Sequence, residues 1–171
     1  MGTRFSRGFA TVVLSAAFAT SILSAQTEAK RSSEPAVVSV DLLRHPVSAR
    51  VRPLLLKAVD KIESGDHEAA IEQLKDMLAK FPDSAPYVHD LLGVAYVKTD
   101  RCEAAVTSFE QAALLLPHDP TTQYYLGLAL LCAGDYERAT QEIQRAVKLD
   151  PQNLRMQARL NALLERKHSG N

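Results

Sequence analysis

The side chains of this chain best suited to metal binding or catalysis are its two cysteines, Cys102 and Cys132, and its five histidines. The histidines are spread along the sequence, at His45, His67, His89, His118 and His168. Two cysteines without a nearby pair of histidines do not make up the usual ligand set of a zinc site. A catalytic centre needs a nucleophile, a base and an orienting group in one pocket, and no motif of that kind occurs. The sequence therefore predicts a protein that is not an enzyme and uses no metal or cofactor.

The charge of the chain is balanced and gives no sign of a nucleic-acid partner. Lysine and arginine together number 20, and aspartate and glutamate also number 20. A nucleic-acid surface is expected to show a basic stripe with interleaved aromatic residues. Here the basic residues are scattered among acidic ones, so we expect no nucleic-acid binding.

Three prolines mark a repeated pattern in the helices that are expected to carry the cysteines and histidines. Pro82, Pro117 and Pro151 are separated by 35 and 34 residues, and each follows an amphipathic stretch. In that stretch apolar residues recur at i, i+3 and i+4, which indicates one buried stripe of an α-helix. A second apolar stretch precedes each one, and no strand pattern competes. The repeated unit is therefore predicted to be a pair of antiparallel helices.

The residues within this period resemble the tetratricopeptide-repeat family, whose unit is a 34-residue helix-turn-helix. In the second copy the family's packing positions hold Leu92, Gly93, Tyr96, Ala105, Phe109, Ala112 and Pro117. In the third copy they hold Leu126, Gly127, Leu130, Ala139, Ile143, Ala146 and Pro151. The first copy matches at Ala70, Leu74, Met77 and Pro82 but has Ala58 and Lys61 at the glycine and large positions, which indicates a divergent terminal repeat.

The resemblance implies an all-α fold, a right-handed superhelical solenoid of about three helix-turn-helix repeats with a C-terminal capping helix. We expect the repeats at residues 51–84, 86–119 and 120–153, the capping helix at 154–167 and a disordered tail at 168–171. Asp119 before Pro120 and Asp150 before Pro151 are expected to cap the helices that follow them, since aspartate is a favoured N-cap and proline suits the first turn.

The N-terminal residues 1–25 have the composition of an export signal. Arg4 and Arg7 precede an apolar run at residues 9–23, and small residues follow at Ser24 and Ala25. Export to the periplasm or outside the cell is expected, with cleavage after Ala25. The open alternatives are an uncleaved membrane anchor that tethers the protein, a mitochondrial transit peptide or a buried helix. Residues 26–50 are expected to form a linker and a lead-in to the first repeat.

A disulfide between Cys102 and Cys132 is compatible with the repeat arrangement. Cys102 is expected to begin the second helix of one repeat and Cys132 to end the first helix of the next. Adjacent repeats bring such turn regions close together, and an exported protein meets an oxidising compartment. Separate buried cysteines are the alternative.

The inner face of such a solenoid, lined by the first helix of each pair, is the candidate binding site. Mapped from the family, its residues are Leu55, Val59, Ile62, Tyr87, Asp90, Leu91, Val94, Val97, Tyr124, Leu128 and Leu131. Relatives that clamp a chaperone's C-terminal carboxylate use Lys, Arg and Asn on this face. The matching positions here hold Leu55, Val59, Leu91, Thr121 and Tyr125, so that activity is not expected.

The sequence therefore favours a non-catalytic adaptor that binds another protein through an apolar peptide or an amphipathic helix. The main alternative is a structural or assembly protein that uses the repeats for self-association as a homo-oligomer or in an envelope complex. The inner face could also be covered by the chain's own residues 36–47 or by a second copy.

Overall fold

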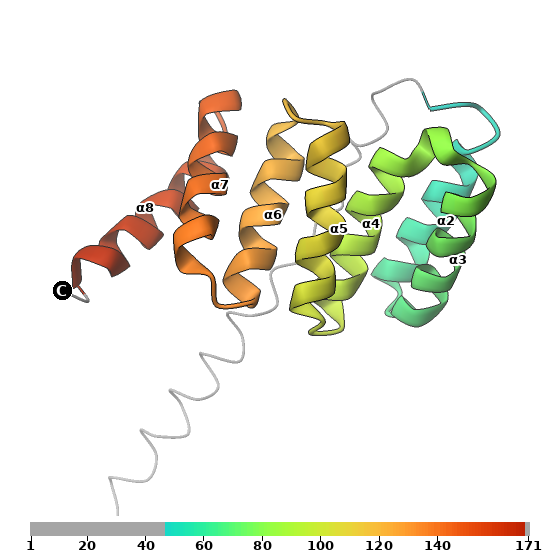
Figure 1. Cartoon of the computed structure of the whole chain (residues 1–171), viewed down its shortest axis with the longest axis horizontal. Helices are drawn as coiled ribbons and strands as arrows, with labels where there is room; N and C mark the ends of the chain where they lie inside the picture. The colour runs from blue at the N-terminus through green and yellow to red at the C-terminus, as the bar shows by residue number, and fades with distance from the viewer. Residues whose placement is uncertain (1–46, 170–171) are drawn as a thin grey trace, which may run out of the picture. The chain divides into compact units, whose positions relative to one another are not determined.

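The computed structural model describes residues 47–169, and within this part of the chain all regular structure is helical (Figure 1). Its elements are α2 (Arg52–Glu63), α3 (His67–Lys80), the short 3₁₀ helix η2 (Pro82–Ser84), α4 (Ala85–Lys98), α5 (Cys102–Leu115), α6 (Pro120–Cys132), α7 (Tyr136–Leu149) and α8 (Leu154–Ser169). All of them belong to one compact unit. The predicted export segment and most of the lead-in lie outside the described residues.

The helices form three pairs, α2 with α3, α4 with α5 and α6 with α7, and each pair is closed by the same tight turn. The turn places one residue in the left-handed region, with φ of 88° at Gly65, 56° at Asp100 and 83° at Gly134. The next residue then donates its N–H back across the turn, from Asp66 to Lys61 O and from Asp135 to Leu130 O, each at 2.9 Å. This pattern satisfies the last free carbonyls of the first helix. The chain therefore reverses within three residues.

Small residues let the two helices of a pair approach closely, as the sequence predicted. A Cβ built on Gly93 would lie 2.6 Å from the ring of Phe109, which is fully buried. The same ring stacks on Tyr125 of the next pair with 5.9 Å between centroids. The contact between glycine and a large side chain therefore joins the helices within one pair and also supports the neighbouring pair.

Helix α8 packs on the last pair and has no second helix of its own within the described residues. Met156 is buried with Tyr124, Ile143 and Ala146, and Leu160 and Leu163 pack partly against this cluster. Leu154, in contrast, is 76% exposed. The helix therefore covers the open face of the last pair with one side only.

The expected helix caps are correct at Asp119 and wrong at Asp150. The Asp119 carboxylate accepts the N–H of Thr122 at 2.6 Å and starts α6. Asp150 instead ends α7, and Asn153 is the side chain that accepts the N–H of Met156, at 3.3 Å. The two turn residues Pro151 and Gln152 separate Asp150 from Asn153, so the helix begins later than the aspartate–proline pair suggests.

Across residues 47–169, no helix is both long enough and apolar enough to span a bilayer. The capping helix continues through Ser169, two residues beyond its expected end at 167.

Replacing Gly127 by alanine should destabilise the protein by up to about 2 kcal/mol, because an overpacking cost of about 1–3 kcal/mol is only partly offset by a gain of about 1 kcal/mol in helix propensity. The new Cβ would lie 2.5 Å from Cγ1 of Ile143 and 3.2 Å from the backbone oxygen of Ala139, which has little freedom to move. Urea unfolding measures the change, and Gln141→Ala on the exposed side of α7 is the control, expected within about 0.5 kcal/mol of the parent. A raised urea midpoint for Gly127→Ala would show that this close approach does not exist.

Candidate functional site

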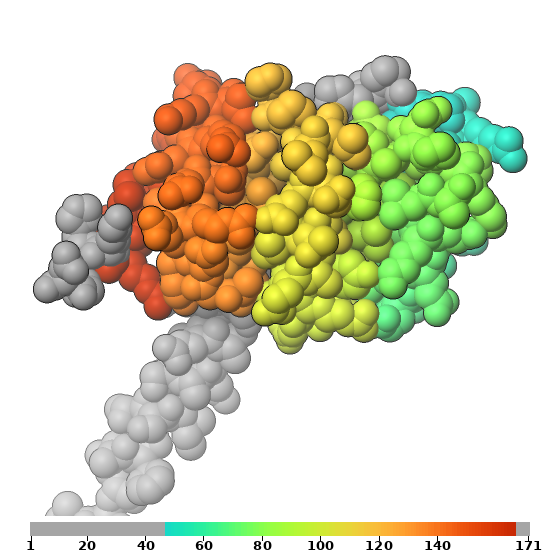
Figure 2. Space-filling view, viewed as in Figure 1, coloured from blue at the N-terminus to red at the C-terminus, as the bar shows by residue number. Residues whose placement is uncertain are grey.

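The inner-face residues predicted from the sequence lie on the first helices of the three pairs. Helices α2 and α4 contact each other, as do α4 and α6, so these helices form a continuous row. The second helices α3, α5 and α7 dominate the surface seen in Figure 2, in green, yellow and orange. The two sets of helices therefore present separate faces.

The structure buries most of these residues. Leu55, Ile62, Tyr87, Asp90, Leu91, Val94 and Tyr124 are each less than 9% exposed. Val59, Val97, Leu128 and Leu131 are partly exposed. In the third pair Leu128 and Leu131 pack against the cluster that Tyr124 forms with α7 and α8, so they also stabilise the fold. Val59 and Val97 are therefore the inner-face positions at which binding can be tested with least effect on the core.

A buried acid, Asp90, lies on this face in the second turn of α4 and is joined to the next repeat. The hydroxyl of Thr122 on α6 lies 2.9 Å and 3.1 Å from the two carboxyl oxygens of Asp90 on α4. Both side chains are at most 3% exposed. The pair therefore ties the first helices of adjacent repeats together through their side chains. The sequence reasoning did not find Thr122, because it follows the Asp119–Pro120 cap and resembles an ordinary first-turn residue.

Burial controls the protonation of this site. It raises the pKa of Asp90 to about 8, against the lowering effect of the Thr122 hydrogen bond and with a further increase from nearby Asp119. The pKa of Tyr87 is also raised, by burial and then by Asp119 and Asp90. Burial lowers the pKa of His89. At neutral pH Asp90 is therefore mainly a neutral acid, which can donate as well as accept a hydrogen bond.

The site can bind a guest by shape and neutral hydrogen bonding. Among residues 47–169, no cluster of histidine, cysteine, aspartate and glutamate has the arrangement of a metal site. The positions that would carry a cationic clamp hold Leu55, Val59, Leu91, Thr121 and Tyr125. An apolar segment with free backbone groups suits this chemistry, since apolar side chains supply area and the acid and phenol supply hydrogen bonds.

Two depressions lie away from the inner face, and sequence reasoning predicted neither. One of about 490 Å³ lies between α7 and α8, where the Arg166 guanidinium stacks 4.6 Å from the centre of the Tyr136 ring. The other, of about 600 Å³, is lined by α5, α6 and α7 and contains the exposed ion pair of Arg138 and Glu110 at 2.5 Å. Neither contains Asp90 or Thr122.

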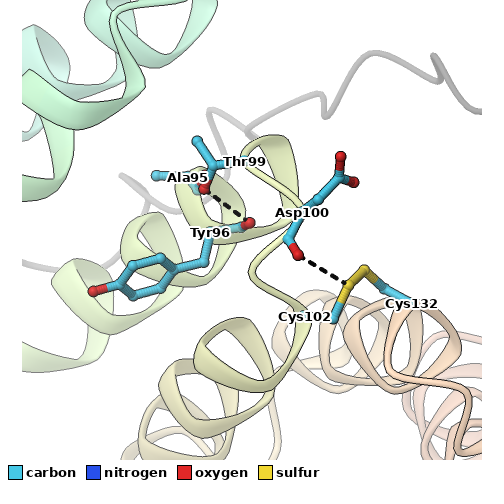
Figure 3. The surroundings of a disulfide bond; sticks show 6 residues. All are labelled: Ala95, Tyr96, Thr99, Asp100, Cys102 and Cys132. Atoms are coloured by element: carbon cyan, nitrogen blue, oxygen red, sulfur yellow. Dashed lines mark hydrogen bonds between the residues drawn. A yellow bond between two sulfur atoms is a disulfide. The ribbon is translucent and has the colours of Figure 1, made fainter.

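A disulfide joins Cys102 at the start of α5 to Cys132 at the end of α6 (Figure 3). The two Cα atoms are 5.4 Å apart, and the bond closes a separation of 30 residues. In Figure 3 the bond lies beside the turn that contains Asp100, whose carbonyl oxygen is 3.8 Å from Cys102 Sγ. The bond therefore links the second and third pairs at one end of the row. One of the two helices that it joins, α6, also carries Thr122.

Comparison with known proteins places this arrangement among helical-repeat domains. Residues 91–153 match the family model described as tetratricopeptide repeat. A search of curated proteins found no matching sequence.

Solved structures show the same fold at low identity. The first tetratricopeptide domain of Spaghetti (RPAP3), bound to an HSP90 peptide, is 18% identical with a TM-score of 0.65, over 73% of this chain and 98% of that one. The Sgt2 domain from Aspergillus fumigatus is 19% identical with a TM-score of 0.66, over 72% and 83%. The type III secretion translocator chaperone SycD from Yersinia enterocolitica is 19% identical with a TM-score of 0.64, over 71% and 96%.

The described part of the chain is therefore an α-solenoid built from helix-turn-helix repeats. Within it, residues 91–153 match the tetratricopeptide-repeat family model, and the fold is shared with solved tetratricopeptide-repeat domains.

Reduction of the disulfide should lower the free energy of unfolding by about 2–4 kcal/mol, because a cross-link over a loop of this size restricts the unfolded chain. The measurement is the urea midpoint with and without dithiothreitol. The double variant Cys102→Ser, Cys132→Ser is the control: it should match the reduced parent and not respond to the reductant. Equal midpoints for the oxidised and reduced parent would exclude a stabilising bond.

Stability should depend on pH through Asp90. In the folded protein Asp90 keeps its proton up to about pH 8, whereas the ordinary pKa of an aspartate carboxyl is 3.8. The folded state then binds more protons than the unfolded state between these values, so Asp90 makes stability fall as pH rises through that window. Asp90→Asn imitates the neutral acid and removes this dependence.

Urea unfolding of the parent and of Asp90→Asn should therefore give the most similar midpoints at about pH 4, and the parent's midpoint should fall progressively below that of the variant up to about pH 8. His89 titrates in both proteins and cancels in the comparison. A difference between the two proteins that stays constant with pH would contradict a raised pKa at Asp90.

Proposed function

We propose that this chain is an exported, non-catalytic adaptor that binds an apolar peptide or an amphipathic helix of another protein on the inner face of α2, α4 and α6. The observation that carries the proposal is the chemistry of that face. Its residues are apolar side chains with one neutral acid and two tyrosines, and the positions where a charge clamp would need cations are uncharged. Recognition by shape and neutral hydrogen bonds follows from these groups.

The similar structures support the general role and leave the ligand open. The Spaghetti domain was solved with an HSP90 peptide, and SycD is a translocator chaperone. Both share the helical-repeat architecture, whose extended inner surface is suited to protein segments. Because their identities to this chain are below 25%, the class of peptide is argued from the chain's own residues.

Export is proposed from the sequence of residues 1–25 and is compatible with the disulfide. A signal of this kind directs the chain to a compartment in which disulfides persist. If the segment is retained, the repeats are tethered to a membrane.

The alternative is a structural or assembly role through self-association. It is favoured by exposed leucines on α5 and at the start of α8, with Leu114 74%, Leu115 51% and Leu154 76% exposed. Light scattering over a range of concentrations separates the two roles, because self-association depends on the concentration of this chain alone.

Selection from a peptide library should yield peptides rich in Leu, Val and Ile, with affinity that depends on Val97. Val97→Lys places an ammonium group on the partly exposed inner face and should weaken binding of a selected peptide by about tenfold or more, because an anchor contact is lost and a charge is desolvated. Fluorescence polarisation with the labelled peptide measures the dissociation constant.

Leu114→Lys is the matched control, since it makes the same change on the exposed side of α5 and should leave the affinity unchanged. The acidic peptide SRMEEVD seen with the Spaghetti domain should show no saturable binding, because the five clamp positions of the inner face hold no lysine, arginine or asparagine. Equal loss of affinity in both lysine variants, or tight binding of SRMEEVD, would refute the proposed recognition.

A further inference from the structure

The end of the inner face at which the first helices begin carries its polar groups. Tyr87 and Asp90 lie in the first two turns of α4, and Thr122 lies in the first turn of α6. The partly exposed apolar position Val97 lies toward the other end of α4. A guest on this face thus meets hydrogen-bonding groups at one end and apolar contacts along its length.

The chain enters the fold at that same end. The N–H groups of Val51 and Arg52 donate to Ser48 O at 3.0 Å and 3.1 Å, which fixes the turn that leads into α2. The Arg50 guanidinium lies 5.4 Å from the centre of the Phe81 ring, beside the end of α3 and the start of η2. The first described residues, from Val47 to Val51, therefore lie beside the beginning of α2, and Arg50 reaches the residue that precedes η2.

We infer that residues 37–46 of the same chain occupy the inner face of α2, α4 and α6 and act as an intramolecular competitor of the partner. The segment reads Val-Val-Ser-Val-Asp-Leu-Leu-Arg-His-Pro. Its β-branched residues favour an extended backbone, and the proline keeps the residue before it extended. Occupancy of the face by the segment does not depend on the proposed function. The statement that a partner must displace the segment does rest on it.

The segment is long enough to reach α6, the first helix of the third pair. Ten extended residues span about 33–36 Å. Helices in contact are about 8–10 Å apart, so the axes of α2, α4 and α6 extend over about 20 Å. The segment can therefore start beside α2 and cross both following helices.

The chemistry of the segment matches that of the face. Its apolar residues Val38, Val40 and Leu42 alternate and so lie on one side of an extended strand, facing the apolar inner surface. An extended guest also presents unpaired backbone groups, and among the described residues Asp90 is hydrogen-bonded through its carboxyl oxygens to Thr122. The basic residues of the segment, Arg44 and His45, are closest to the entry. Acidic side chains occur at that end of the helices, at Asp83 before α4 and Asp119 before α6.

Covalent attachment makes even weak binding effective. A tethered segment experiences a local concentration in the millimolar range, so an intrinsic dissociation constant near 1 mM is enough to fill the face about half of the time. A partner then binds only to the open fraction, and its apparent affinity is reduced accordingly. The attached segment therefore raises the affinity that a partner needs in order to bind.

The first test places a photo-crosslinking amino acid at Val40 in the full chain and needs no partner. Adducts of monomeric mass to α4 or α6 are expected, and changing Val38 to aspartate in the same chain should reduce their yield. Adducts of dimeric mass would assign the face to a second copy, and the absence of adducts to these helices would also overturn the inference.

The second test measures binding of a labelled peptide of residues 37–47, added in trans to the full chain. The variant Val38→Asp, Val40→Asp should bind this peptide at least about twofold more tightly than the parent, because a segment that fills the face about half of the time halves the apparent affinity. The control Ser32→Asp, Ser33→Asp places the same charges upstream of the segment and should behave like the parent. Equal affinity in all three chains, or no binding by any of them, would overturn the inference.

The two proposals fail in different ways. Crosslinks to α4 or α6 without binding of any library-selected peptide would refute the adaptor and keep the intramolecular segment. Selected peptides that bind with the same affinity to parent and segment variant would refute the competitor and keep the adaptor.

Discussion

The close contact between glycine on a first helix and a large side chain on the second is the constraint on which the rest of the structure depends. Gly93 accepts the ring of Phe109, and Gly127 accepts the side chain of Ile143. Each contact sets how closely two helices pack, and the Phe109 ring passes this spacing to the next pair through Tyr125. Because interiors are densely packed, one added methyl group at these positions is felt across a pair. The inner face exists because the first helices are held in this regular row.

Two bonds between repeats then fix that row. The disulfide of Cys102 and Cys132 joins one end of α6 to α5, and the hydrogen bond of Thr122 to Asp90 joins its other end to α4. The covalent bond restricts the unfolded chain, whereas the polar pair makes the inner face sensitive to protonation. Helix α6 is thus held at both ends. This is where the face combines apolar area with neutral hydrogen-bonding groups.

Much of the fold could be predicted from sequence because the residues that pack the helices recur at the same positions in successive repeats. The prolines, the glycines at positions 93 and 127 and the large residues Phe109 and Ile143 recur in register, so their roles follow from position alone. The cap of α8 could not be predicted in this way, since Asp150–Pro151 looks like Asp119–Pro120 while Asn153 begins the helix. Local motifs of this kind do not record how many residues the turn contains.

The candidate site was less predictable, because it depends on contacts between repeats. Thr122 meets Asp90 over 32 residues of separation, and neither residue type signals the other. The burial of Leu91 and Val94 likewise cannot be derived from the face on which they lie. The most direct test of the account is nuclear magnetic resonance mapping of a selected apolar peptide on the isotope-labelled chain. We predict shift changes at amides of α2 and α4 around Val59 and Val97, whereas changes confined to α5 and α7 around Leu114 would contradict the account.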